Sequence, residues 1–89
     1  MNKSGNINIE KIARKGSEIY EKIKSQYAMT DNGKFLAIDT DTEERFISDS
    51  SSEAVQLARA KYPNKVFYVV RIGYSAVEIL SILSHIQHA

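Results

Sequence analysis

The chain has 89 residues, of which 43% are hydrophobic and 26% charged, and this composition predicts one globular domain with one modest core. It contains no Cys, which excludes disulfides and thiolate metal sites and favours an intracellular, cytoplasmic location. Its N-terminus lacks the apolar core of a signal peptide, and its longest apolar run is too short to span a bilayer, so we expect no membrane association.

Charge is unevenly distributed along the chain, although the net charge is only +1. Residues 1–27 hold six Lys or Arg against three Asp or Glu (+3), residues 28–53 hold two against seven (−5), and residues 54–89 hold four against one (+3). An acidic middle between basic ends suits self-association or a charged protein partner. The excess at either end is too small to favour nucleic acid.

Residues 8–27 carry the pattern of a long amphipathic helix. Asn6 or Asn8 is placed to cap it. Gly16 has two interpretations: it marks the close approach of another element, or it is a tolerated Gly that costs about 1 kcal/mol relative to Ala. Eight residues at the i, i+3, i+4, i+7 spacing form the apolar stripe of this helix: Ile9, Ile12, Ala13, Gly16, Ile19, Tyr20, Ile23 and Tyr27.

Residues 34–48 predict an antiparallel β-hairpin. An Asp-Asn-Gly turn signal precedes a short strand over 35–39, and an acidic turn separates it from a second strand over 45–48. A second helix follows over 51–62. Its start is indicated by Ser50 and Glu53, which have the spacing of a capping box, and Pro63 stops it.

Residues 65–72, KVFYVVRI, predict a buried strand. The run is rich in β-branched residues and apolar on both alternating faces, which is typical of a strand covered on two sides. The helical crossover before it makes it parallel to the second hairpin strand and antiparallel to the first. The expected fold is therefore α+β, an N-terminal amphipathic helix and a small antiparallel sheet in ββαβ(β) order, with strand order 2-1-3, extended to 2-1-3-4 by a fourth strand.

Residues 75–87 fit either a strand or a helix. Ser75 and Glu78 have capping-box spacing, and the apolar residues recur at helical spacing, which slightly favours a helix. Val77, Ile79 and Ile82 favour a strand instead, and the preceding Gly-Tyr-Ser would turn it back along residues 65–72.

Three stretches, GKFLAID (33–39), RFISDSSSEAVQLARAKYPNK (45–65) and VFYVVRIGYSAV (66–77), resemble a family of short prokaryotic proteins without an assigned activity. Similar proteins tend to end soon after the RIGYSAV-like element, which implies a strand over 75–80. Some are encoded beside a retropepsin-like aspartic protease, or in arrangements like toxin–antitoxin pairs, which implies a protein partner rather than a catalyst. The segment SILSHIQHA (81–89) extends beyond the common pattern.

No residue pattern supports catalysis, so we expect neither an enzyme nor a cofactor. There is no nucleophile–base pair and no Gly-rich phosphate loop. The acidic run at 39–44 has part of the spacing of a calcium loop but lacks its central Gly and closing Glu. His85 and His88 have no third ligand near them in sequence, so we predict no metal site. Arg71, beside an apolar face, needs a counter-ion, and Asp39 across the first hairpin strand is favoured over an acidic residue of a partner.

Surplus apolar surface is the feature that bears most on function. Two helices must cover a sheet whose last strand is apolar on both faces, and residues 76–86 add seven further apolar residues. Either helix 8–27 covers that surface or a second molecule does.

These observations favour a non-catalytic protein-interaction module that self-associates as a homodimer, with a protein encoded by a neighbouring gene (antitoxin-like or protease-associated) as a second candidate partner. The alternative is a small nucleic-acid-associated regulatory protein that binds through helix 8–27, although interleaved Glu residues dilute the positive field there. The predicted interaction residues are Phe67, Arg71, Val77, Ile79, Ile82 and Leu83.

Overall fold

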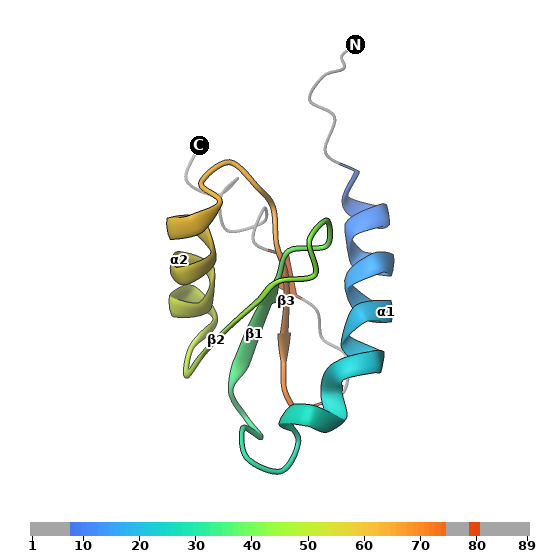
Figure 1. Ribbon diagram of the computed structural model, residues 1–89, viewed down its shortest axis with the longest axis vertical. Helices are drawn as coiled ribbons and strands as arrows, with labels where there is room; N and C mark the ends of the chain where they lie inside the picture. Colours follow the sequence, from blue (N-terminus) through green and yellow to red (C-terminus); the bar gives the residue numbers. More distant parts are fainter. Residues whose placement is uncertain (1–7, 75–78, 81–89) are drawn as a thin grey trace.

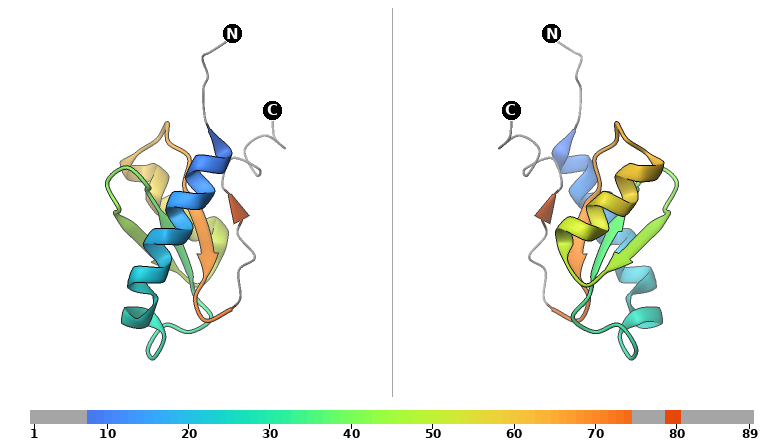
Figure 2. Two further views of the ribbon diagram at one scale, coloured as in Figure 1. Left: turned by 90° about the vertical axis from the view of Figure 1, so that its right-hand side faces the viewer. Right: turned by 90° about the vertical axis from the view of Figure 1, so that its left-hand side faces the viewer.

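The computed structural model describes residues 8–74 and 79–80 and has the predicted α+β class (Figure 1). An antiparallel sheet in the order β2-β1-β3 lies between two helices, and Figure 2 shows α1 in front of one face of the sheet and α2 in front of the other. The elements are α1 (Ile9–Tyr27), β1 (Phe35–Ile38), β2 (Arg45–Ser48), α2 (Ser51–Lys61) and β3 (Tyr68–Arg71).

Helix α1 begins where one of the two candidate caps places it. The Asn8 side chain accepts a hydrogen bond from the Lys11 backbone N–H at 3.0 Å, which satisfies one unpaired donor of the first turn. Gly16 faces β3 so closely that a Cβ atom there would lie 2.5 Å from Tyr68 Cβ and closer still to Tyr68 Cγ. Of its two interpretations, the close approach is the one that the structure shows.

The antiparallel hairpin agrees with the prediction, and the structure gives its register. Phe35 pairs with Ser48 and Ile38 with Arg45, and the other edge of β1 pairs with β3 from Phe35–Arg71 to Ile38–Tyr68. The inner strand of these three is therefore β1, and β3 is parallel to β2, as the crossover predicts.

Strand β3 is shorter than the predicted 65–72. Its ladder begins at Tyr68, and Lys65 before it lies at the hairpin turn, where its ammonium is 3.0 Å from the Asp39 carboxylate. Ile72 continues the pairing past the end of the strand, donating to the Lys34 carbonyl and accepting from the Gly33 N–H, both at 2.8 Å.

Helix α2 has half of the predicted capping box. Ser50 Oγ accepts from the Glu53 backbone N–H at 3.2 Å, as expected of an N-cap. The Glu53 carboxylate, however, accepts from Ser48 Oγ at 2.8 Å and ties the helix start to the end of β2. This contact takes the place of the reciprocal bond of the box.

Two apolar clusters fill the space between the sheet and its helices. The α1 side is larger, and the α2 side uses two fully buried alanines that let this helix lie close to the sheet. Residues 67–72 alternate between the two sides, so both apolar faces of this segment are covered by helices of the same chain. The α1 side contains Ile19, Tyr20, Ile23, Leu36, Ile38, Tyr68, Val70 and Ile72, and the α2 side contains Ala37, Ala54, Ala58, Phe67 and Val69.

The outer edge of β3 pairs with a two-residue strand, β4 (Ile79–Leu80), through Tyr68–Leu80 and Val69–Ile79. Most of the segment predicted as strand or helix, 75–87, lies outside the described residues, and two pairs are too few to define a full fourth strand. The order 2-1-3-4 therefore stays a prediction. Neither helix within residues 8–74 combines the length and apolar character needed to cross a lipid bilayer.

Candidate functional site

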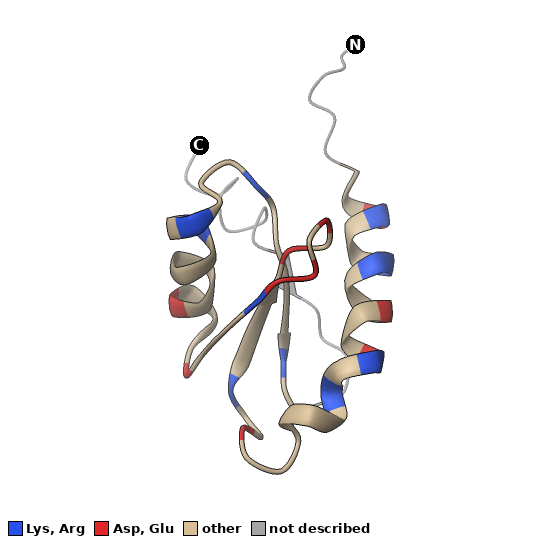
Figure 3. Cartoon of the chain, in the orientation of Figure 1, with Lys and Arg blue, Asp and Glu red and all other residues tan. Residues whose placement is uncertain are grey.

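The acidic hairpin turn at residues 39–44 is a structured part of the domain (red in Figure 3). The Asp39 side chain is only 2% exposed. One of its oxygens accepts from the Asp41 N–H at 3.0 Å, and the other accepts from Thr42 Oγ1 at 3.1 Å and from Lys65 Nζ at 3.0 Å. The carboxylate thus organises the turn and attaches it to the loop before β3.

Burial is the largest influence on the Asp39 pKa and raises it, but the hydrogen bonds from Lys65, the Asp41 N–H and Thr42 together outweigh burial and hold the pKa below its usual value. The hydrogen bond to Asp39 likewise raises the pKa of Lys65. Both shifts have the sign of a structural ion pair that is charged at neutral pH.

A second carboxylate attaches the turn to the end of α2. Glu44 accepts from Lys61 Nζ and from the Tyr62 hydroxyl, both at 2.7 Å, and the hydrogen bond from Lys61 is the main reason that its pKa is lowered. The Tyr62 ring also packs edge-on against Phe46, with ring centroids 6.4 Å apart. These contacts assign Glu44 to the structure of the domain.

Arg71 does not pair with Asp39, so that prediction was wrong. The register places Arg71 opposite Phe35, at one end of β1, whereas Asp39 follows the other end. Arg71 Nε instead donates to the Gly33 carbonyl at 3.1 Å, and the guanidinium carbon lies 4.1 Å from the centroid of the Tyr74 ring. A neutral acceptor and an aromatic ring take the place of the expected counter-ion.

The structure separates the other predicted interaction residues. Phe67 is fully buried in the α2-side cluster, so it is a core residue and adds nothing to the surface of the folded domain. The backbone of Ile79 pairs with Val69 at the outer edge of β3. Val77, Ile82 and Leu83 lie outside the described residues, as do both histidines.

A hollow of about 430 Å³ lies between α1 and the outer edge of β3. Tyr20, Tyr68, Val70 and Tyr74 contribute apolar and aromatic surface to it, and Lys24 lies at its rim, where it pairs with Glu21 at 2.7 Å. The Tyr20 hydroxyl accepts from the Gly73 N–H at 3.2 Å, which attaches the end of this strand to α1.

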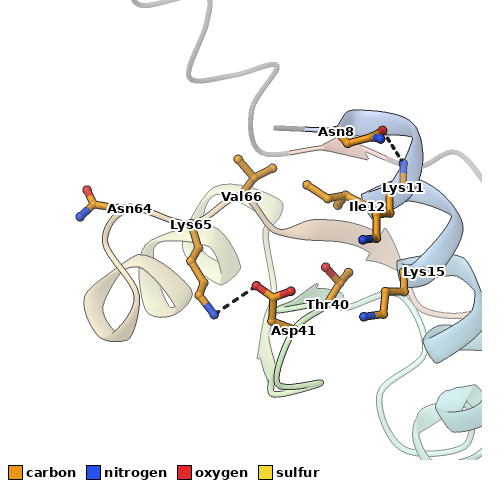
Figure 4. A pocket seen from close by; sticks show the side chains of 9 residues that line it. All are labelled: Asn8, Lys11, Ile12, Lys15, Thr40, Asp41, Asn64, Lys65 and Val66. Atoms are coloured by element: carbon orange, nitrogen blue, oxygen red, sulfur yellow. Dashed lines mark hydrogen bonds and ion pairs between the residues drawn. The ribbon is translucent and has the colours of Figure 1, made fainter. Parts of the chain in front are cut away.

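A pocket of about 320 Å³ lies on the other side of α1, between its first two turns and the hairpin turn. Figure 4 shows the ammonium groups of Lys11 and Lys15 directed toward the Thr40 hydroxyl, with Lys65 beside Asp41 on the opposite wall. Sequence reasoning missed this convergence because the α1 residues and Thr40 are far apart in the chain, and only the docking of α1 on the sheet brings them together.

Among residues 8–74 and 79–80, no three His, Cys, Asp or Glu side chains are grouped so that they could hold a metal ion. No family model, curated protein or solved structure matches the chain. The family resemblance therefore rests on its three sequence stretches alone.

Proposed function

We propose that the protein is a non-catalytic interaction module that self-associates through the outer edge of β3 and the apolar residues that follow it. The observation that carries this proposal is that each helix already covers one face of the sheet. The apolar stripe of α1 packs on one face and that of α2 on the other. Within the described residues, the apolar stripes of both helices are already packed on the sheet, so neither stripe can cover the seven apolar residues of 76–86.

The edge of β3 supports the same proposal. Among the described residues, its outer side pairs at Tyr68 and Val69, and beside it lies the hollow lined by Tyr20, Val70 and Tyr74. A fourth strand here would give the order 2-1-3-4 and would present its own outer edge to a second copy. Antiparallel pairing of two such edges about a twofold axis buries the same surface on each copy. In this arrangement Val77, Ile79, Ile82 and Leu83 supply the apolar contacts.

Sedimentation or light scattering of the full chain tests self-association. We expect a dimer, and we expect Ile82→Asp and Leu83→Asp to raise its dissociation constant by about tenfold or more, because each places a charge in the interface. Met29→Asp is the matched control, since Met29 is apolar but 93% exposed and lies in the loop after α1, outside β3 and the residues that follow it. A wild-type monomer that binds no dye for exposed apolar surface would contradict the proposal.

The family resemblance supports a second partner, a protein encoded beside this one. Affinity capture from native lysate of the source organism, followed by mass spectrometry, tests it. We expect one co-purifying protein that is lost with Ile82→Asp and retained with Met29→Asp. A cytoplasmic location is part of this proposal and is supported by the absence of Cys from the sequence.

Nucleic-acid binding through α1 is the alternative. One observation favours it: Lys11 and Lys15 are exposed and form no ion pair with any residue that the structure describes. Acidic and basic residues alternate along the outer side of α1, which weakens its field (Figure 3). This alternative predicts duplex or single-strand binding that weakens steeply with salt, and a retardation assay without a shift at low salt would eliminate it.

A further inference from the structure

The pocket between α1 and the hairpin turn has two cations on one wall. Lys11 and Lys15 are one helical turn apart and lie on the same side of α1. Neither has an ion-pair partner among residues 8–74 and 79–80, and Figure 4 shows both ammonium groups reaching into the pocket. Within the described residues, no carboxylate is therefore paired with either ammonium group, and the nearest acidic wall of the pocket is that of Asp41.

The Thr40 hydroxyl lies where these cations converge. Thr40 is only 6% exposed, and in the described part of the chain its side chain has no hydrogen-bond partner. Every fully enclosed side-chain oxygen or nitrogen there has a partner, so the Thr40 hydroxyl opens onto the pocket. A largely buried hydroxyl without a protein partner is a donor left available for a ligand.

The opposite wall carries more negative than positive charge. Lys65 lies 3.0 Å from Asp39 and 3.5 Å from Asp41, so one ammonium group faces two carboxylates and adds no net positive charge to the pocket. At the helix terminus, the Lys11 N–H is not available to a ligand, because the side chain of Asn8 already accepts from it. The positive potential of the pocket thus comes from the two lysine side chains.

Part of the remaining wall of the pocket is apolar, and it indicates that an anion bound by the two lysines would carry an organic group. Ile12 and Val66 give the pocket an apolar side. Its volume of about 320 Å³ exceeds that of a bare oxyanion and falls at the lower end of the range of about 300–1,000 Å³ for small-molecule sites.

We propose that this pocket binds a small phosphate monoester, whose dianion contacts the Lys11 and Lys15 ammonium groups and accepts from the Thr40 hydroxyl while its organic part packs on Ile12 and Val66. Two cations match a dianion better than a singly charged carboxylate or phosphodiester. This site is separate from the β3 edge, so it does not depend on self-association.

Phenyl phosphate is the probe, titrated into the full chain at low salt and followed by calorimetry and by amide chemical shifts. We expect saturable binding that shifts the amides of Lys11, Lys15 and Thr40. Inorganic phosphate binds more weakly because it lacks the ring, and benzoate binds more weakly because it carries one charge. Affinity for phenyl phosphate falls below about pH 6, where a phosphate monoester gains a proton.

Variants distinguish specific binding in this pocket from non-specific attraction of the phosphate to positive charge on α1. Thr40→Val, Lys11→Gln and Lys15→Gln each weaken binding by about threefold to tenfold. Thr40→Ser retains the hydroxyl and restores binding, which distinguishes a lost contact from a damaged fold. Lys22→Gln removes an exposed α1 lysine outside the pocket and leaves the affinity unchanged.

Three results overturn the proposal. The first is no saturable binding of phenyl phosphate. The second is an equal loss of affinity in Lys22→Gln and Lys15→Gln, which would show non-specific charge attraction. The third is displacement of phenyl phosphate by an oligonucleotide without terminal phosphates, which would assign these lysines to nucleic-acid binding instead.

Discussion

Gly16→Ala tests the close approach of α1 to β3. The new Cβ would lie 2.5 Å from Tyr68 Cβ, whereas ordinary contact begins at 3.4 Å, so the helix must move outward by about 1 Å. Tyr68 cannot give way, because it is 1% exposed and belongs to the α1-side core. The substitution therefore acts on the whole helix–sheet interface.

The expected magnitude has three parts. Overpacking a filled interior costs about 1–3 kcal/mol. Loosening the contacts of Ile19, Tyr20 and Ile23, each worth about 1.5–3 kcal/mol when buried, costs about 1–2 kcal/mol more. Ala regains about 1 kcal/mol over Gly in a helix interior. The free energy of unfolding should thus fall by about 1–4 kcal/mol, although Ala is the better helix former.

Urea unfolding followed by circular dichroism measures this change, at one protein concentration because self-association would add to the apparent stability. Ser25→Ala, at an exposed position of the same helix, is the control and should change stability by less than about 0.5 kcal/mol. If Gly16→Ala is as stable as the wild type or more so, α1 does not rest on Tyr68 and the reasoning fails.

The remaining predictions concern the hairpin turn, a helix cap and the core. Because the pKa of Asp39 is lowered in the folded state, the stability that this carboxylate contributes is complete above its unfolded-state pKa, near pH 4, and is lost as the pH falls through its folded-state pKa. Asp39→Asn should flatten this acid limb of the stability–pH curve and lower the free energy of unfolding by about 1–3 kcal/mol at neutral pH. Asp41→Asn, at an exposed carboxylate, should preserve the acid limb. Ser50→Ala should lower the free energy of unfolding by about 1 kcal/mol in urea titration, and Ser52→Ala, which caps nothing, should match the wild type. Phe67→Ala should cost about 3–5 kcal/mol in the same assay; a stable variant altered in association alone would return Phe67 to the interaction surface.

Local signals in the sequence were sufficient for the hairpin, the N-cap of α2 and the crossover, and they narrowed the N-cap of α1 to Asn6 or Asn8. Asn8 and Ser50 act within three residues of themselves, so their roles do not depend on the rest of the fold. The two alternating faces of 67–72 also predicted their burial, because strand periodicity fixes the direction of each side chain.

Tertiary placement could not be read from the sequence in the same way. The partner of Arg71 depends on the strand register. Arg71 lies opposite Phe35 at one end of β1, and the four residues of β1 separate it from Asp39, which follows the other end. The importance of Gly16 depends on which side chain faces it, and that is fixed only when α1 docks. The same docking sets Lys11 and Lys15 beside Thr40, so no local pattern could indicate that pocket.

The position of α1 in the chain has a consequence for biosynthesis. Ile19, Tyr20 and Ile23 leave the ribosome early, but half of the sheet face that they cover, Tyr68 and Val70 of β3, is made some fifty residues later, a separation of about half the chain. The hairpin and α2 have local contacts and can form while the apolar stripe of α1 is still exposed to chaperones or to other nascent chains. The first helix to be synthesised can therefore bury its apolar stripe completely only after β3 has been made.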